Sequence, residues 1–347
     1  MYMEKAIDFI ELKHILLSAV RKLFCLSLIA VLITGCASDE QTAQKSESNQ
    51  VESINQVESI NQVESIDLGE GIDEDQSTRM PGEKQNSSDS NDNGTLQDIL
   101  EVRFLKVGKA DAIVLMCGGE TMVIDCGEED DGREVLACLK SRGVKKVDVL
   151  MITHFDKDHV GGADTLVEGI KVEKVLLPAY TGSSTEYTDF MNAIGKAGID
   201  PVNVTENMNL VLGSASILVE PPASYEIPAG VSEYDNDFSL ITTVEFDGKR
   251  LVFTGDSEKK RIREWIAGGS AAECDVLKIP HHGVYNKALD ELLSVTKPSH
   301  TVICDSKKNP ADEKTLGLIK KIGAVCMQTQ YGDIVIICSR EGIEIHQ

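Results

Sequence analysis

Short apolar runs punctuated by turn residues dominate the chain beyond residue 100. Runs of this length, rich in Val, Ile and Leu and bounded by Gly, Asp or Pro, predict β-strands. The predicted strands span residues 101–107, 111–117, 121–125, 147–153, 172–178, 215–220, 239–246, 250–255, 275–280, 301–305, 324–329 and 333–338. Gly118-Gly119 and Asp247-Gly248 each separate two such runs, and dipeptides of this kind predict tight hairpin turns.

Segments with the apolar spacing of helices lie between these runs, and several end at Gly, which is typical of a helix C-terminus. The predicted helices span residues 132–143, 186–198, 257–269, 287–295 and 312–323. The strands fall into two groups with helices between them. This order predicts a mixed α/β fold, layered as a sandwich, that occupies residues 99–347.

The N-terminal segment has a different pattern. Residues 23–35 form an apolar run that is too short to span a bilayer comfortably but suits the core of a signal peptide. The end of this run, ITGC at residues 33–36, resembles a bacterial lipoprotein lipobox. The resemblance implies a signal segment over residues 1–36, lipidation of Cys36, and a protein anchored at the extracytoplasmic face of a bacterial cell membrane. The alternative is an uncleaved transmembrane anchor.

Residues 37–98 contain few large apolar side chains. They include the repeat VESINQVESINQVESI at residues 51–66, followed by a stretch rich in Ser, Asp, Asn, Glu and Gln. Such a composition buries too little apolar surface to offset the entropy of ordering the chain. It predicts a disordered acidic tether. The alternative is a small coiled or partner-binding segment, and the sequence identifies no protein partner.

Charge and cysteine content restrict the function further. The formal charge of −23 divides into +1 for residues 1–36 and −12 each for residues 37–100 and 101–347. An acidic chain has no general attraction for DNA or anionic lipid, so nucleic-acid binding would need a local positive site such as bound metal ions. The nine cysteines show no C-x-x-C pairing, which predicts small core residues rather than a disulfide framework or a zinc ribbon.

Candidate chemistry gathers where predicted strands end. The strand 147–153 runs directly into HFDKDH at residues 154–159, the strand 250–255 into Asp256, and the strand 275–280 into His281-His282-Gly283. Four of the seven histidines lie in two of these loops. Neutral imidazoles and carboxylates are the groups that hold a hydrolytic metal ion with a position left open for water.

The number of donors predicts two divalent ions that share a hydroxide. Two ions need about six or seven protein donors. The sequence supplies six: His154, Asp156, Asp158, His159, Asp256 and one of His281 and His282. The spacing does not decide between the two adjacent histidines. Gly161-Gly162 and Gly283 are expected to let the backbone pass close to the site and to start helices whose N-termini favour an anion.

Five motifs in order carry a family resemblance. They are VGKADAIVL (107–115), MVIDCG (122–127), HFDKDH (154–159), the segment from Asn236 to Asp256 that opens NDFSL and ends TGD, and DVLKIPHHG (275–283). Together they resemble the metallo-β-lactamase fold superfamily, and in particular the soluble domain of ComEC-type competence proteins, which form DNA-uptake channels. The resemblance covers residues 101–340.

The resemblance implies a four-layer αββα sandwich with the metal ions at one edge. It implies that His154 and Asp156 bind one ion, that Asp158, His159 and one histidine of the pair bind the other, and that Asp256 bridges them. Asp158 and Asp256 are therefore the candidate catalytic residues. Asp237 is either a substitute for an absent ligand histidine or a turn or cap residue.

Other residues are candidates for binding substrate. Asn236 and Lys157 lie close to the motifs, although Lys157 reads equally as a solvated loop lysine. Stacking on bases is open to Tyr180, Tyr187, Tyr234 and Tyr285, for which ordinary packing is the alternative.

Besides the absent ligand histidine, the sequence departs from the family pattern at three places. Val284 follows His-His-Gly where a serine is common, and Asn309-Pro310 stands where a longer segment with a histidine is usual. The third departure is Asp156, a carboxylate where the superfamily has histidine. A site richer in oxygen shifts the preference from zinc toward manganese, and both metals remain candidates.

Three functions follow. The first is an exported metallohydrolase of phosphodiesters, with single-stranded DNA as one candidate substrate and a metal-bridged hydroxide as nucleophile. The second is hydrolysis of a lactone, thioester or amide by the same apparatus. The third is a non-catalytic surface-binding lipoprotein, which the nearly complete ligand set disfavours.

Overall fold

A computed structural model describes residues 99–227 and 234–347 of the chain. The predicted signal segment, Cys36 and the predicted tether all lie outside the described residues. Within the described residues, no helix is both long and apolar enough to cross a membrane.

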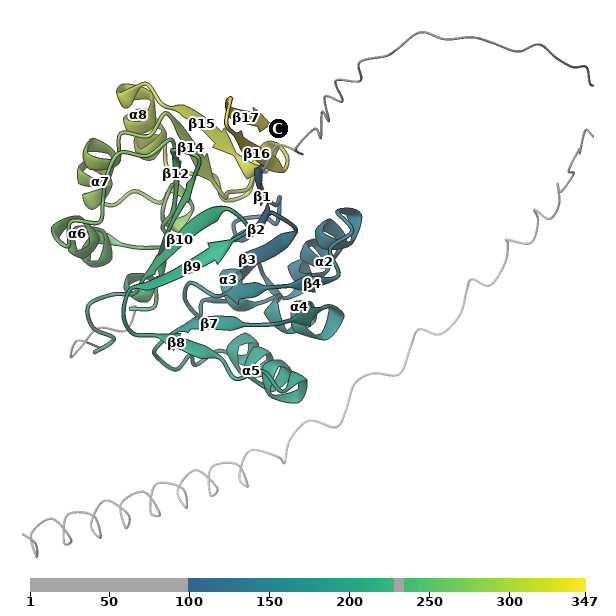
Figure 1. Ribbon diagram of the computed structural model, residues 1–347. Coiled ribbons are helices and arrows are strands. Elements are labelled where there is room, and N and C mark those ends of the chain that lie inside the picture. The colour runs from purple at the N-terminus through teal and green to yellow at the C-terminus, as the bar shows by residue number, and fades with distance from the viewer. Residues whose placement is uncertain (1–98, 228–233) are drawn as a thin grey trace, which may run out of the picture. The chain divides into compact units, whose positions relative to one another are not determined.

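Two large β-sheets form the centre of the fold (Figure 1). The first has the strand order β17 (Gly342–His346), β16 (Ile334–Ser339), β1 (Leu100–Phe104), β2 (Ala112–Cys117), β3 (Glu120–Cys126), β5 (Val149–Met151), β7 (Val175–Pro178) and β8 (Val202–Val204). The second has the order β15 (Val325–Gln328), β14 (His300–Ile303), β13 (Val276–Lys278), β12 (Lys249–Phe253), β11 (Ile241–Phe246), β10 (Ala215–Glu220) and β9 (Met208–Leu212). A separate pair joins β4 (Lys146–Val147) and β6 (Lys171–Val172).

Helices cover the outer face of each sheet. Figure 1 shows α2 (Gly132–Ser141), α4 (Ala163–Gly169) and α5 (Thr185–Ala197) beside the first sheet, and α6 (Lys259–Ala267), α7 (Ala288–Thr296) and α8 (Glu313–Ile322) beside the second. One short helix, α3 (Lys157–Val160), and four 3-10 turns at Glu129–Asp131, Asn236–Phe238, His281–Gly283 and Thr329–Tyr331 complete the described elements. The predicted four-layer αββα sandwich is confirmed.

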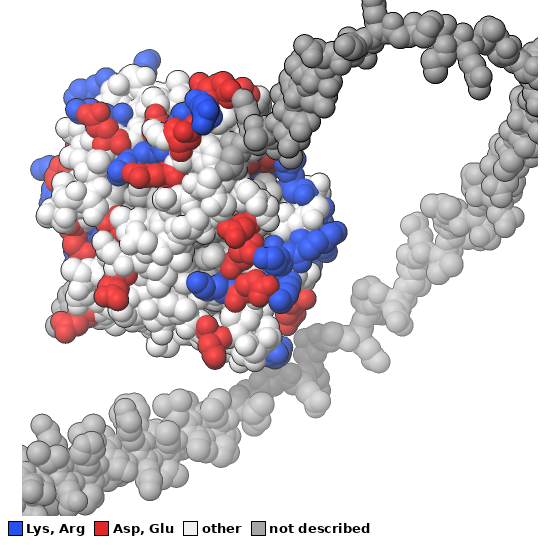
Figure 2. Space-filling view, in the orientation of Figure 1, with Lys and Arg blue, Asp and Glu red and all other residues white. Residues whose placement is uncertain are grey.

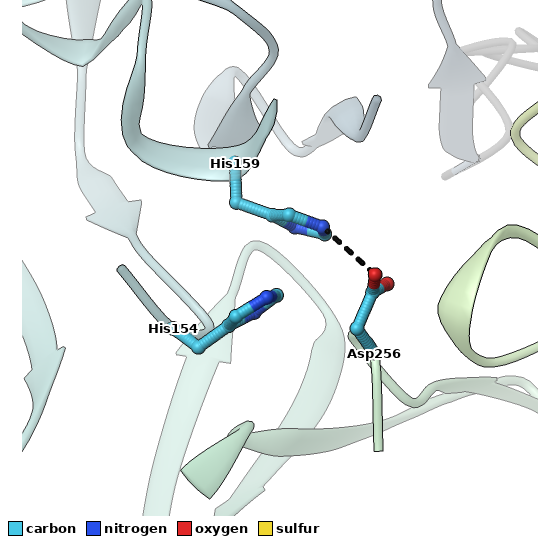
Figure 3. A group of neighbouring side chains, drawn as sticks. All are labelled: His154, His159 and Asp256. Carbon is cyan, nitrogen blue, oxygen red and sulfur yellow. Dashed lines mark ion pairs between the residues drawn. The ribbon is translucent and has the colours of Figure 1, made fainter. Parts of the chain in front are cut away.

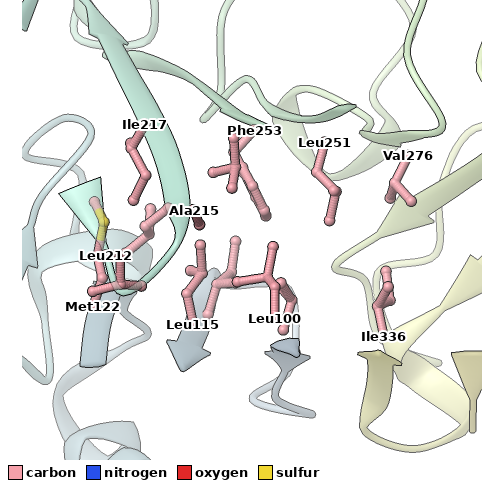
Figure 4. Packing of buried hydrophobic residues seen from close by; sticks show 14 of the residues in the cluster. Leu100, Leu115, Met122, Leu212, Ala215, Ile217, Leu251, Phe253, Val276 and Ile336 are labelled. Atoms are coloured by element: carbon pink, nitrogen blue, oxygen red, sulfur yellow. The ribbon is translucent and has the colours of Figure 1, made fainter. Parts of the chain in front are cut away.

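The main core lies between the two sheets (Figure 4). Leu100, Leu115 and Ile336 from the first sheet face Phe253 and Val276 from the second, and all of these side chains are buried. Burying a side chain of this size contributes about 1.5–3 kcal/mol. Two further apolar clusters lie between each sheet and its helices, so the alternation of apolar runs and amphipathic helices in the sequence is what produces the four layers.

Both predicted hairpin turns are confirmed. Gly118 and Gly119 join β2 to β3 with φ values of 58° and 82°, and Asp247 and Gly248 join β11 to β12 with φ values of 45° and 77°. Positive φ at both central residues is the conformation that suits the twist of a hairpin, and Gly adopts it without steric cost.

Parallel strands bring the motif loops to one edge of the sandwich. In the first sheet β3 pairs in parallel with β5, and in the second β12, β13 and β14 pair in parallel. Carboxyl ends of parallel strands lie at the same edge of a sheet. The loops after β12 and β13 therefore lie at one edge of the second sheet. The segment after β5 of the first sheet lies beside them at the same edge of the sandwich, because His159 and Asp158 contact Asp256 and His282.

Candidate metal centre

His154 from the loop after β5, His159 from the helix α3 that follows it, and Asp256 from the loop after β12 form the first part of the site (Figure 3). His154 and His159 are fully buried, with their ring centroids 4.1 Å apart. His159 Nε2 lies 3.3 Å from Asp256 Oδ2. One ligand atom from each of these three residues lies within 4.8 Å of the other two, which is close enough for all three to hold one ion.

His282 and Asp158 form the second part. His282 Nε2 lies 3.0 Å from Asp256 Oδ2 and 3.4 Å from Asp158 Oδ2. The His159 and His282 rings are 5.3 Å apart between centroids. Asp158, His159 and His282 again place ligand atoms within 4.8 Å of one another. Asp256 Oδ2 thus faces imidazoles of both parts, as a shared ligand should.

The imidazole nitrogens that face the centre fit metal ions. Among the described residues, none forms an aligned hydrogen bond to Nε2 of His154, His159 or His282, although carboxylate oxygens lie nearby. A buried polar atom without a hydrogen bond costs about 1–3 kcal/mol, so three at one point need a common explanation. A divalent cation provides it, because neutral imidazoles and carboxylates are ligands of Zn²⁺ and Mn²⁺.

The outer ring nitrogens are held by partners that fix this orientation. His159 Nδ1 lies 2.8 Å from Asp125 Oδ2, and His282 Nδ1 lies 2.8 Å from the carbonyl oxygen of Cys304. Thr153 Oγ1 donates to Asp125 Oδ2 and so accepts from His154 Nδ1 at 3.1 Å. A proton on each Nδ1 leaves the lone pair of Nε2 directed at the centre.

The structure separates the two adjacent histidines that the sequence left equivalent. His282 is buried and faces Asp158 and Asp256. The His281 ring instead lies beside Glu258, with Nδ1 3.2 Å from Oε1. Of the pair, only His282 is therefore placed to ligate an ion at this centre.

Comparison with known proteins agrees with this geometry. Residues 107–304 match the sequence pattern of the family described as the metallo-beta-lactamase superfamily. The chain belongs to this superfamily. The predicted resemblance is therefore confirmed.

Three similar proteins illustrate its place there. The chain is 29% identical over 171 residues to ComE operon protein 3 of Bacillus subtilis. The matched region covers 49% of this chain and 21% of that protein. It is 26% identical over 224 residues to recombination protein 2 of Haemophilus influenzae, covering 60% of this chain and 25% of that protein. The metallo-beta-lactamase fold protein YhfI from Bacillus subtilis aligns with a TM-score of 0.50 and 9% identity over 69% of this chain and all of that one, which shows the fold alone.

This member of the superfamily places Asp156 at the rim of the centre. Its Oδ2 lies 3.5 Å from His154 Nε2, and 45% of its side chain is exposed. It is positioned to add an oxygen ligand on the side of His154. It also lines a neighbouring pocket of about 350 Å³, together with Tyr234, Asp235, Asn236, Asp237, Glu258 and His281.

Asp237 is oriented toward a helix instead of toward the centre. Its Oδ1 accepts a hydrogen bond of 2.9 Å from the backbone N–H of Arg261, in the first turn of α6. It lies outside the groups of convergent ligands formed by the described residues. Of the two alternatives from the sequence, the structure therefore favours the cap.

The remaining predicted binding residues are less closely tied to the centre. Asn236 Nδ2 donates to Glu258 Oε1 at 3.4 Å and lines the same pocket, whereas Lys157 is exposed on α3. Tyr180 packs against Phe155 and Phe238, at ring-centroid distances of 4.7 and 5.0 Å. The ring centroids of Tyr187 and Phe155 are 4.5 Å apart, and Lys314 Nζ lies above the ring of Tyr285. Tyr234 alone of these tyrosines lines the pocket.

Sequence reasoning missed three buried charged residues behind the ligands. Asp111 and Asp125 are at most 1% exposed, and Lys278 is fully buried. Lys278 Nζ forms an ion pair with Asp111 and lies 3.3 Å from Asp256 Oδ1. Each of the three stands beside or within an apolar strand, and a charge in such a run is the signal that was available.

The ionisation of the centre suits cation binding. Burial works against the charged form of Asp256, but His282, His159 and Lys278 outweigh it and hold the pKa of this carboxyl well below its usual range. The pKa of Asp158 is likewise lowered, because the close His282 imidazole and the charges of His159 and His282 outweigh burial. Burial would lower the pKa of His282, but Asp256 and Asp158 raise it to about 9. The carboxylates are therefore ionised, and a cation that binds displaces protons from the imidazoles.

Proposed function

We propose that this chain is a metal-dependent hydrolase of phosphodiester bonds that uses two divalent ions, zinc or manganese. The observation that carries the proposal is the convergence of three buried imidazole Nε2 atoms, which lack hydrogen bonds, on the carboxylates of Asp158 and Asp256. When bound, a pair of such ions activates water and stabilises the charge that develops on a phosphoryl oxygen.

The ligand residues form two groups. His154, His159 and Asp256 form one ligand group, with Asp156 at its rim. Asp158, His159 and His282 form the second group, so His159 belongs to both, and Asp256 Oδ2 lies 3.0 Å from His282 Nε2. Because the three histidines are buried and their Nδ1 atoms are held by Asp125, Thr153 and Cys304, the site is organised before substrate arrives.

The similar proteins support a nucleic-acid substrate. The name of recombination protein 2 connects that protein with recombination. The chain spans only 21% and 25% of their lengths, so their activities as whole proteins extend to this chain only as part of the proposal.

One observation favours a second candidate, the hydrolysis of an uncharged or cationic lactone, thioester or amide. The pocket beside the centre is lined by four carboxylates, those of Asp156, Asp235, Asp237 and Glu258. Like charges in such a pocket repel a polyanion. Figure 2 also shows acidic and basic side chains interspersed on the visible face, without a continuous basic surface for a long DNA strand.

We also infer that the chain works outside the cytoplasm, tethered to the membrane by lipid on Cys36. The support is the apolar run that ends in the lipobox-like ITGC, followed by a polar segment long enough to hold the folded domain off the surface. This inference is independent of the hydrolase assignment.

A substrate panel tests the two hydrolase candidates. The purified protein is assayed with Mn²⁺ or Zn²⁺ on bis-p-nitrophenyl phosphate, single-stranded DNA and a set of lactones. The proposal expects metal-dependent cleavage of the phosphodiesters that chelation abolishes. Cleavage of lactones alone would favour the second candidate, and a protein that binds two ions but cleaves nothing would favour the non-catalytic alternative.

A further inference from the structure

A lysine lies buried beside the candidate metal centre, where a cation is unexpected. Lys278, at the end of β13, is fully buried. Its ammonium forms an ion pair with Asp111 and donates to the Gly255 carbonyl oxygen at 2.9 Å and to Asp256 Oδ1 at 3.3 Å. An ammonium has three N–H donors, and these three acceptors use all of them. The lysine is thus fixed in position.

The contact with Lys278 distinguishes the two oxygens of Asp256. Oδ1 faces Lys278, whereas Oδ2 faces both His159 Nε2 at 3.3 Å and His282 Nε2 at 3.0 Å. The Asp256 backbone N–H also donates to Ser239 Oγ at 3.1 Å, which holds the main chain of the same residue. The carboxylate therefore has one orientation, with a single oxygen toward the ligand groups.

We propose that Lys278 is a positioning residue that occupies Asp256 Oδ1, so that Asp256 serves both ions through Oδ2 alone. This inference rests on the proposed dinuclear site. Without the ammonium, Oδ1 would be free to turn toward an ion, and Asp256 would chelate one ion with both oxygens instead of joining two. Asp111 has a different part: its carboxylate neutralises Lys278, which allows the lysine to be buried without removing the charge of Asp256.

The roles of Lys278 and Asp111 can be separated by mutation. Lys278→Met removes the ammonium at nearly constant volume but leaves Asp111 buried without its cation, which threatens folding. The double variant Lys278→Met/Asp111→Asn removes both charges and restores electrical balance. Asp111→Asn alone is the matched control, because it keeps the ammonium on Asp256. Circular dichroism and thermal melting establish which variants fold.

Manganese binding is the readout, because it does not depend on activity. Each protein is titrated with Mn²⁺, and electron paramagnetic resonance distinguishes a spin-coupled pair from isolated ions. We expect the folded double variant to bind its second ion about 10- to 100-fold more weakly than the wild type, the usual effect of losing an outer partner, and to lose the coupled signal. Asp111→Asn should keep the coupled pair.

Two results would overturn the inference even if the wild type binds a pair of ions. One is a double variant with wild-type affinity for both ions and an intact coupled signal, since Lys278 would then serve only to neutralise Asp111. The other is a structure of the manganese-loaded wild type in which Asp256 Oδ1 ligates an ion. A wild type that holds a coupled pair but cleaves no phosphodiester leaves this inference standing and refutes the proposed substrate instead, whereas a wild type that binds no pair refutes both.

Discussion

At the scale of single residues, the centre depends on which way each ring points. His281 and His282 are neighbours in sequence, and both have positive φ values, of 50° and 51°. This turn sends one ring to the ligands and the other to Glu258. Spacing in the sequence contains no information about that turn, which is why the two residues were equivalent before the structure.

The first prediction separates these neighbours. His282→Ala removes a buried ligand and should lower the bound metal from two ions toward one, whereas His281→Ala should retain both. Metal content after desalting, measured by inductively coupled plasma mass spectrometry, checks the pair. Full metal content in His282→Ala together with loss in His281→Ala would reverse the assignment.

A second prediction concerns Asp158, whose Oδ2 lies 3.4 Å from His282 Nε2. Asp158→Ala should abolish phosphodiesterase activity and lower metal affinity at least as much as the roughly 10- to 100-fold expected for loss of an outer partner. Lys157→Ala is the matched control for metal affinity on the same helix, because its side chain is exposed. Metal retained at full stoichiometry in Asp158→Ala would count against its place among the ligands.

The motif predicted most residues that face the centre but not those behind them. His154, Asp158, His159 and Asp256 stand out because imidazoles and carboxylates cluster after strands. Asp111, Asp125 and Lys278 act through other side chains, so their roles depend on distances across the fold rather than along the chain. For the same reason the sequence left Asp237 open between ligand and cap.

At the scale of elements, buried strands and amphipathic helices were predictable, but three of the four edge strands of the two large sheets were not. The predicted helices correspond to α2, α5, α6, α7 and α8, with shifts only at their ends. The strands β8, β9 and β17 were missed. They lie at the edges of their sheets and each has at most one buried residue, so their apolar signal is weak.

A competing hydrogen bond explains why one predicted strand ends earlier than expected. The strand predicted over residues 147–153 divides into β4 and β5 and ends at Met151. Beyond it, the backbone N–H of Thr153 donates to Asp125 Oδ1 at 2.8 Å rather than to a neighbouring strand. The short helix α3 was not predicted, because its few residues show too little periodicity. A helix was expected to start at Gly161-Gly162 but was given no bounds, and α4 begins there, at Ala163.

A third prediction tests the Gly-Gly that follows the motif. A Cβ on Gly162 would lie 2.3 Å from the backbone nitrogen of Gly132 and 2.4 Å from the carbonyl oxygen of Cys126. Gly162→Ala should therefore destabilise the fold by about 1–3 kcal/mol, because two backbone segments would have to separate. The free energy of unfolding from urea denaturation measures this.

Gly195 in α5 supplies the control, since a Cβ there meets nothing within 4 Å. Gly195→Ala should stabilise the protein by about 0.5–1 kcal/mol, because alanine favours a helix interior. Equal stabilities of Gly162→Ala and Gly195→Ala would show that the close approach of the loops is not a constraint.

At the scale of the whole molecule, a fourth prediction concerns the residues that precede the folded part. Cys36→Ala should move the protein from the membrane fraction to the soluble exported fraction and abolish incorporation of labelled fatty acid, because the lipid would lose its attachment point. Fractionation of cells and labelling check this. A Cys36→Ala protein that stays in the membrane would instead support an uncleaved transmembrane anchor.

The candidate metal centre also takes its ligands from both halves of the sandwich. His154, Asp158 and His159 follow a strand of the first sheet, whereas Asp256 and His282 follow strands of the second. Ions held by both groups bind the folded state and not the unfolded chain, so they should stabilise folding by about 2.7 kcal/mol when free metal is a hundredfold above its dissociation constant.

The fifth prediction follows from this linkage. For a folded domain of this size, 1 kcal/mol corresponds to about 2–4 °C in Tm. Chelation should therefore lower the Tm of the wild type by about 5–11 °C, and added Mn²⁺ or Zn²⁺ should restore it. The His282→Ala variant should show a smaller shift, because its metal no longer joins both sheets through that ring. Differential scanning calorimetry in matched buffers measures both shifts. An unchanged Tm in the wild type would mean that no ion bridges the halves, and equal shifts in both proteins would place the stabilising ion elsewhere.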